Sequence, residues 1–298
     1  MAKIYKIDRP LNPNLPYFAY DAFKPGQVAF PIIKHFIIDI KYGDVNYQLK
    51  QRNGNPLVVD ERGYFKTYGY LIYFNNEFVD VNHEDGPYDA YDFIRSTKSK
   101  SLYNWHEVNI NGERANILVS KNRNFGEPFT ENNGIYEGRN DKGFYGPLEY
   151  IYNHKEEVNE YYDYNSFYKL QMLYMLLWSS IDKYLSLSYG GWDQRKNIIE
   201  WSKCQEFKCA IENNVHGSHE NAYSSQGAKS YAFNINNPQS CAEYYYQVRC
   251  NVVHSGKNNY KDFNNLNQSL NELLYIFWDV LDDSFNDEDE IMRSFRNW

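Results

Sequence analysis

Two side chains that suit phosphate chemistry stand five positions apart near the carboxyl-terminal end, in the run Arg249-Cys-Asn-Val-Val-His254. A histidine, with an unperturbed pKa near about 6.5, can take and return protons at neutral pH. An arginine is a permanent cation that can pair with two phosphoryl oxygens at once. RNA cleavage without a metal needs a group that takes the 2′-hydroxyl proton, one that protonates the leaving 5′-oxygen, and positive charge on the phosphorane. Arg249 and His254 supply these functions, and Asn251 can orient the histidine or hold the phosphate.

A helix must position this segment. The apolar pattern predicts a helix over Gln239–Val253 that ends at Ser255-Gly256. On an ideal helix, residues five apart lie about 140° apart around the axis. The long side chain of Arg249 and the conformational freedom of Gly256, which lets the last turn of the helix loosen, can bring the two functional groups closer. Asn251 lies three positions before His254 and therefore shares its face of the helix.

The same run, followed by Ser-Gly-Lys and a further amphipathic helix, resembles the signature of the HEPN superfamily (higher eukaryotes and prokaryotes nucleotide-binding). The resemblance implies a small α-helical bundle that dimerises and sets two motifs face to face across one cleft. It implies that Arg249 and His254 are catalytic and that Asn251 is an auxiliary polar residue, although the family's polar residue often follows the arginine directly, where this chain has Cys250. The family's first long helix often bears an acidic or polar residue that faces the site, and Asp182 is the candidate here.

This resemblance predicts an endoribonuclease that uses no metal or cofactor. It would cut tRNA or mRNA by attack of the 2′-hydroxyl and leave a 2′,3′-cyclic phosphate. Many such proteins act in host defence, as anti-phage or toxin-type effectors. Two alternatives stay open. One is a non-catalytic HEPN-like module that binds RNA, nucleotide or a partner protein, and the other is a small-molecule enzyme that uses a cavity in the amino-terminal half.

The amino-terminal half carries a second resemblance, over residues 15–120. Leu15-Pro-Tyr-Phe-Ala-Tyr20-Asp-Ala-Phe-Lys-Pro-Gly26 resembles the ligand loop of the gamma-glutamylcyclotransferase-like fold, a small mixed β-barrel with a cavity. Asp21 stands where that loop has a glycine, and the family's catalytic glutamate falls near Thr97 or Lys98. We therefore expect a degenerate domain that serves as a scaffold, a sensor or a docking surface for a phage-derived or protein trigger.

The whole chain is expected to be an α+β protein, with a β-rich barrel domain over residues 1–145 and an α-helical bundle over residues 146–298. Helices are predicted in the segments 88–96, 167–187, 239–253 and 263–281, and strands in 28–33, 36–40, 68–74 and 115–119. Asn53-Gly54 and Asn111-Gly112 predict hairpin turns.

Composition limits the possible partners. The 298 residues carry a net charge of -8, so RNA contact requires a local basic patch or a dimeric cleft. No run approaches the ~20 apolar residues of a membrane span, and no signal peptide is recognisable. The 4 cysteines favour reduced thiols in a cytoplasmic protein; a zinc site with His216 and His219 is an open alternative of irregular spacing.

Overall fold

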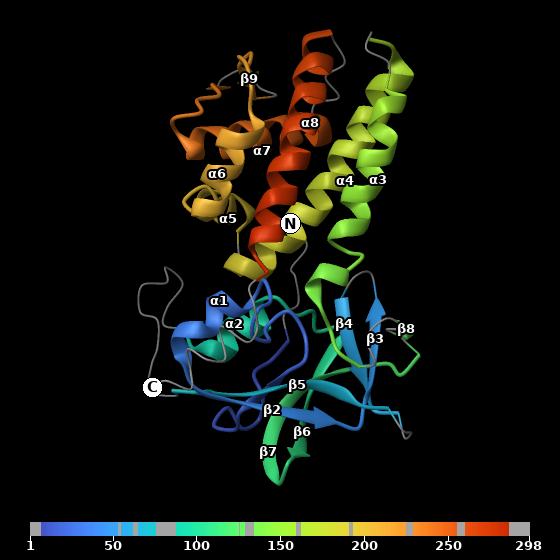
Figure 1. The fold of residues 1–298 in the computed structure, drawn as a ribbon, viewed down its shortest axis with the longest axis vertical. Helices are drawn as coiled ribbons and strands as arrows, with labels where there is room; N and C mark the ends of the chain where they lie inside the picture. The colour runs from blue at the N-terminus through green and yellow to red at the C-terminus, as the bar shows by residue number, and fades with distance from the viewer. Residues whose placement is uncertain are drawn as a thin grey trace. The chain divides into compact units, whose positions relative to one another are not determined.

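The chain is of the α+β class and forms two compact units in the computed structural model (Figure 1). The structure describes residues 7–52, 55–61, 65–75, 88–124, 126–128, 134–158, 162–190, 193–224, 229–254 and 260–285, without the side chains of residues 140, 254, 260 and 261. One unit comprises residues up to Asp141 together with Phe285, and the other is Lys142–Ser284. The division after Asp141 falls a few residues before the expected boundary at residue 145.

The first unit is built on an open five-stranded sheet in the order β2-β5-β1-β7-β6. Its strands are β1 (Tyr17–Ala19), β2 (Ile37–Val45), β5 (Thr67–Phe74), β6 (Tyr103–Ile110) and β7 (Glu113–Ser120). Neighbouring strands are antiparallel except for β1 and β7, which are parallel. The strand order ends at β2 and β6, which share no ladder among the described residues, so the sheet is not closed into the small barrel that the sequence led us to expect. At Gly43 the space beside β2 is filled by the side chain of Ile110, which lies at the end of β6.

The Asn111-Gly112 hairpin is confirmed, and the strands on either side of Asn53-Gly54 pair as predicted, although these two residues lie outside the described part of the chain. Between β6 and β7, Asn111 and Gly112 have φ values of 52° and 89°, which is the conformation of a type I′ turn and explains the Asn-Gly pair. The second hairpin joins β3 (Gln48–Arg52) to β4 (Asn55–Val59), with Arg52 opposite Asn55. Strand β8 (Glu127–Pro128) completes a second sheet in the order β4-β3-β8.

One predicted strand is wrong. The segment 28–33 contains the helix α1 (Phe30–Ile33), which continues into the 3-10 turn η1 (Lys34–Phe36). Pro31 lies in the first turn of α1, where its missing N–H leaves no hydrogen bond unmade. The prediction for α2 (Ala90–Ser96) is confirmed, and Asp89 and Asp92 form a capping box at its start.

The second unit is helical, and its three long predicted helices are confirmed. They are α4 (Tyr164–Tyr189), α7 (Pro238–His254) and α8 (Tyr260–Asp283). Shorter helices that were not individually expected are α3 (Tyr145–His154), α5 (Gln194–Trp201) and α6 (Gln205–Asn214), and the turns η2 (Gly138–Asn140, in the first unit) and η3 (Lys155–Glu157) are also short. A small hairpin of β9 (Ala222–Tyr223) and β10 (Ser230–Tyr231) precedes α7.

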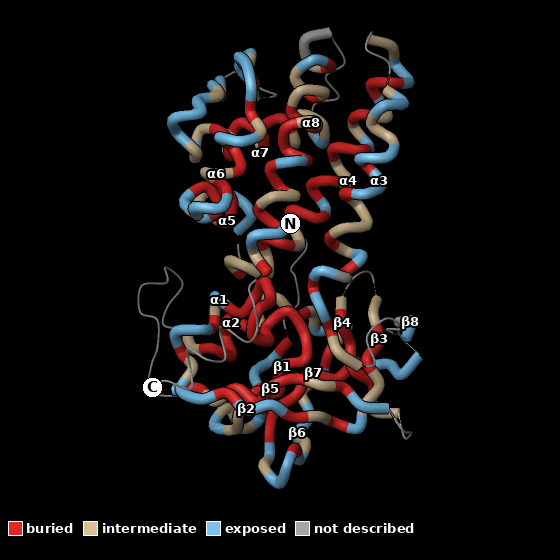
Figure 2. The backbone as a smooth tube through the Cα atoms, viewed as in Figure 1, coloured by how far each residue is buried: buried red, intermediate tan, exposed pale blue. Residues whose placement is uncertain are grey.

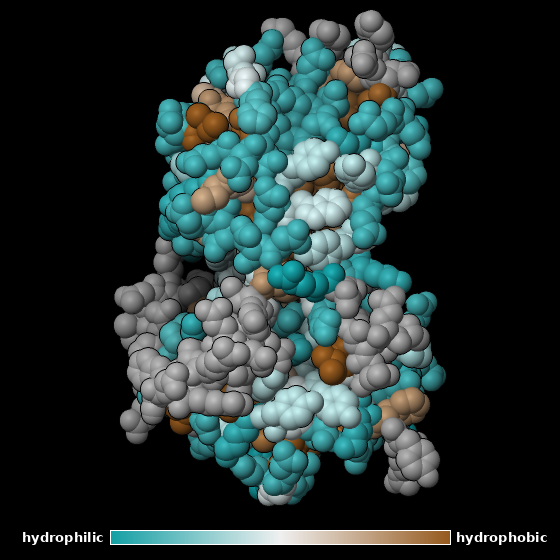
Figure 3. Space-filling view, in the orientation of Figure 1, coloured by the Kyte–Doolittle hydropathy of each residue, from teal (hydrophilic) through white to brown (hydrophobic). Residues whose placement is uncertain are grey.

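Helix α8 contacts α3, α4, α6 and α7, and Figure 2 shows buried backbone along much of its length. Leu270, Leu273 and Phe277 of α8 are fully buried. The face drawn in Figure 3 is mainly hydrophilic, with apolar colour only in separate small areas. No described helix is long and apolar enough to cross a membrane.

Candidate functional site

Helices α4, α5 and α7 meet around the guanidinium of Arg249. Its Nη2 donates to Oδ2 of Asp182 at 2.8 Å, and its Nη1 donates to Oε1 of Gln194 at 3.3 Å. The side chains of Arg249 and Asp182 are 16% and 24% exposed. The structure therefore brings together two of the predicted site residues, which lie 67 positions apart in the chain.

Two aromatic rings flank the same guanidinium. Its carbon lies 5.4 Å from the ring centre of Trp178 and 5.5 Å from that of Tyr246. The two rings contact each other edge to face at 5.9 Å. Contacts of this kind attract a cation to the ring faces and restrict its movement. Sequence reasoning missed Gln194 and Trp178 because their positions follow only from how the helices pack.

Two opposing effects act on the charge of Asp182 in this cluster. Burial raises the pKa of Asp182 above its usual value, although the charge and hydrogen bond of Arg249 act in the opposite direction. Within the described part of the chain, neither Nε of Arg249 nor Oδ1 of Asp182 has a hydrogen-bond partner. The pair thus leaves one strong donor and one strong acceptor unused.

Asn251 lies on a different face of α7. Residues two apart on a helix are separated by about 200°, so Asn251 points away from the Arg249 cluster. Its Oδ1 accepts a hydrogen bond from Nε2 of Gln247 at 2.9 Å, and its side chain lines a cavity of about 490 Å³. The structure does not place Asn251 beside Arg249.

Of the other motif residues, the structure describes the side chain of Cys250 but not that of His254. His254 is the last residue of α7, but its side chain lies outside the described part of the structure. Burial raises the pKa of the Cys250 thiol, against smaller effects of Arg249 and Tyr246. Burial therefore disfavours the thiolate form, the nucleophilic one, at the position directly after the arginine.

In the first unit, the two positions that depart from the cyclotransferase pattern contact each other. Nζ of Lys98 donates to Oδ2 of Asp21, and both side chains are buried. Asp21 also accepts from the backbone N–H of Phe23 at 3.1 Å, while Thr97 hydrogen-bonds the carbonyl of Ile94 at 3.0 Å. Lys98, rather than Thr97, thus faces the loop. Because Lys98 neutralises it, the Asp21 carboxylate is not placed as a free base.

The histidine and cysteine side chains that the structure describes do not gather as metal ligands. Nε2 of His219 lies 2.6 Å from Oε2 of Glu272, which also accepts from the hydroxyl of Tyr245 at 2.8 Å. The cysteines are free thiols, and no group of three or more metal-ligating side chains occurs among the described residues. The His219 and Glu272 pair is 1% and 9% exposed and lies inside the helical unit.

No protein-family model, curated protein or solved structure matches the chain. What the protein does is therefore inferred from its own residues.

Proposed function

We propose that the protein is a metal-independent endoribonuclease of the HEPN type that cuts tRNA or mRNA as a host-defence effector. The supporting observation is the Arg249 cluster, in which Asp182 and two rings hold the guanidinium on the helix that ends at His254. A guanidinium held in this way matches the fixed cation that phosphoryl transfer requires.

The proposed reaction needs no group outside the RNA and the protein. His254 takes the proton of the 2′-hydroxyl, and the 2′-oxygen attacks the adjacent phosphorus. Arg249 stabilises the two phosphoryl oxygens while the bond to the 5′-oxygen breaks, and a second histidine, from the partner subunit of a dimer, returns a proton to that oxygen. The products are a 2′,3′-cyclic phosphate and a 5′-hydroxyl. Asp182 acts by positioning Arg249.

For the first unit, we propose a degenerate cyclotransferase-like domain that docks a phage-derived or protein trigger. The buried contact between Asp21 and Lys98 supports the loss of the ancestral activity, because both positions are used for an internal ion pair. An anionic ligand would have to approach the carboxylate of Asp21 in place of an open backbone amide.

Cleavage of RNA in the presence of EDTA tests the proposed function. The full-length protein is expected to cut tRNA or mRNA and leave cyclic phosphate ends, and Arg249→Ala and His254→Ala are each expected to reduce the rate by about 100-fold or more. Arg195→Ala is the matched control, because Arg195 also links α5 to α7, through Glu243 at 3.6 Å. Intact RNA with wild-type protein, or equal rates for all three variants, would rule the proposal out.

A second candidate is a non-catalytic HEPN-like binding module. The observation that favours it is the 16% exposure of Arg249, which ties three helices together and so has a structural use. This candidate predicts that RNA is bound but not cut, and that His254→Ala leaves the binding unchanged.

A further inference from the structure

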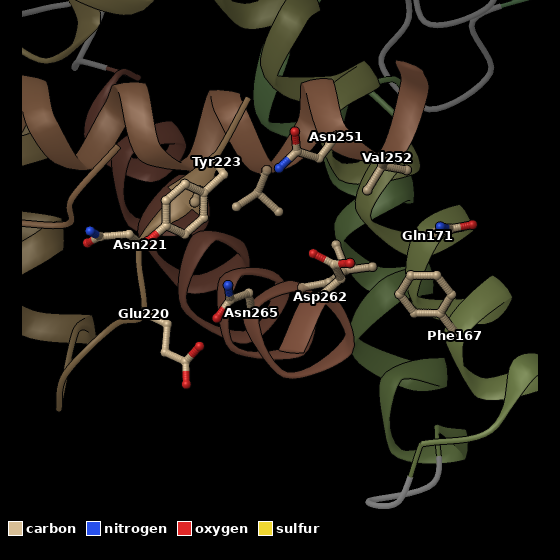
Figure 4. Close-up of a pocket in the computed structure, with 12 residues that line it drawn as sticks. Phe167, Gln171, Glu220, Asn221, Tyr223, Asn251, Val252, Asp262 and Asn265 are labelled. Carbon is tan, nitrogen blue, oxygen red and sulfur yellow. The ribbon is translucent and has the colours of Figure 1, made fainter. Parts of the chain in front are cut away.

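The cavity of about 490 Å³ lies between helices α4, α7 and α8 and strand β9, within the second unit. In Figure 4, Tyr223, Asn251, Asp262 and Asn265 surround a common space, with Phe167 and Gln171 beyond Asp262. Val248 and Leu266 contribute apolar lining. A cavity of this size is large enough for a nucleobase and its ribose, within the range usual for small-molecule sites.

The polar lining combines carboxamides with carboxylates. It consists of four carboxamides, from Gln171, Asn221, Asn251 and Asn265, and two carboxylates, from Glu220 and Asp262. No lysine or arginine is among these described lining residues, so a phosphate group would be repelled. The groups favour a planar, uncharged ligand that offers several N–H donors beside acceptors.

We propose that this cavity binds an unpaired guanine base of the RNA substrate. Only the statement that the base belongs to RNA rests on the proposed function. Guanine presents two adjacent N–H groups that a carboxylate can accept, and two acceptors, O6 and N7, that a carboxamide can reach. Tyr223, which is 51% exposed, offers a ring face for stacking.

Helix α7 connects this cavity to the Arg249 cluster. Val248 and Asn251 line the cavity, and Arg249 projects from another face of the same turn. On α4, Gln171 lines the cavity, and Trp178, which contacts Arg249, lies seven residues later, about 10 Å along the axis. The cavity and the Arg249 cluster lie on different faces of α7, so a base in the cavity and the phosphate beside Arg249 belong to different nucleotides of one RNA strand.

The first test uses guanosine, which lacks a phosphate and so does not depend on Arg249. We expect saturable binding to the full-length protein by titration calorimetry, weakened about tenfold by Asn265→Ala and by Tyr223→Ala. Two matched controls should leave the affinity unchanged: Asn264→Ala, at the exposed neighbouring position on α8, and Tyr168→Ala, at an exposed ring on α4. Absent binding, or equal effects of the Asn264 and Asn265 variants, would overturn the inference.

The second test maps the cut sites on RNA of mixed sequence. Wild-type protein is expected to cut at a fixed distance from unpaired guanines, and Asn265→Ala to keep cutting while the preference for guanine falls about tenfold. Guanosine binding without any cleavage would refute the nuclease and retain the cavity assignment. Cleavage without a guanine preference and without guanosine binding would refute the cavity assignment and retain the nuclease.

Discussion

Arg249 illustrates how a buried charge is accommodated at the scale of single residues. Burying an ion is unfavourable unless it is paired and hydrogen-bonded, and Asp182, Gln194 and two rings supply those contacts. The charge of Asp182 is less well stabilised, since burial raises its pKa in spite of the adjacent cation. The ionised carboxylate is therefore the less stable partner of this ion pair.

This imbalance predicts how stability depends on pH. A carboxyl whose pKa is raised by folding stabilises the protein in its protonated form; that contribution is fully present below the unfolded-state pKa and is lost as pH rises through the folded-state pKa. Asp182→Asn cannot ionise and avoids this loss. Its free energy of unfolding, relative to wild type, should therefore increase as the pH rises from the pKa of an ordinary carboxyl through the higher pKa of Asp182.

Urea denaturation of both proteins across this pH interval measures the difference. Arg249→Met is the companion variant: removing the cation that lowers the pKa of Asp182 should extend the interval to higher pH. A difference between Asp182→Asn and wild type that stays constant, or shrinks as the pH rises, contradicts the assignment.

The buried pair of Asp21 and Lys98 gives a second prediction for single residues. Lys98→Met leaves the Asp21 carboxylate without its counter-ion in the interior, and the free energy of unfolding should fall by about 3–5 kcal/mol. The double variant with Asp21→Asn should recover part of that loss, because both charges are gone. Denaturant unfolding of the three proteins provides the measurement.

The control for that experiment is Lys100→Met, which breaks a pair with Asp8 at 2.7 Å on the surface. Water screens this pair, so the effect should be much smaller. If the Lys98 and Lys100 variants lose the same stability, the buried pair does not stabilise the first unit as described.

The family resemblance predicted part of the candidate site. The identification of Asp182 as a residue that faces the motif came from a family resemblance, and the contact with Arg249 is now visible. The position of Asn251 in a cavity wall could not be predicted, because helical spacing tells which face a residue occupies but not what covers that face. The contact of Lys98 with Asp21 could likewise not be predicted from the sequence, since the two residues lie 77 positions apart.

At the scale of elements, long periodic segments were the easiest to predict. The helix predicted over 167–187 occupies Tyr164–Tyr189, because its buried apolar positions repeat at helical spacing over about five turns. The short apolar run 28–33 was wrongly expected to be a strand, since a run of this length fits either structure and the position of Pro31 decides the outcome. Shorter helices such as α5 depend on tertiary packing.

The start of α4 provides a test of these local rules. The carboxylate of Asp163 accepts the backbone N–H of Ser166 at 2.9 Å, which satisfies one of the free donors at the helix start. Asp163→Ala should lower the free energy of unfolding of the protein by about 0.5–2 kcal/mol, and Asp163→Ser should retain most of it. Thermal or urea unfolding is the measurement.

Asn165→Ala is the control for this prediction, because Asn165 is exposed in the same first turn and alanine is the better helix former. It should leave stability unchanged or raise it slightly. Equal losses for the Asp163 and Asn165 variants would show that the cap does not stabilise α4.

At the scale of the whole molecule, charge is the main constraint on the proposed function. A chain of net charge -8 repels RNA as a whole, and two of its carboxylates line the cavity. Two copies of Arg249 facing each other would create the local positive potential that a single chain lacks. Dimerisation is thus a requirement of the proposed chemistry, which uses one imidazole to take a proton and another to return it.

A mixing experiment tests this requirement. Wild-type and His254→Ala proteins are unfolded together in equal amounts and refolded so that subunits reassort, and about half of the dimers then contain one copy of each. Each mixed dimer keeps only one of the two imidazoles that the reaction uses, so the rate of RNA cleavage should fall to about a quarter of that of the same total amount of wild-type protein. Light scattering during gel filtration should report twice the 35.5 kDa mass of the chain. A monomeric wild-type protein that cuts RNA, or a mixture that keeps about half of the wild-type rate, would mean that each chain carries a complete site of its own.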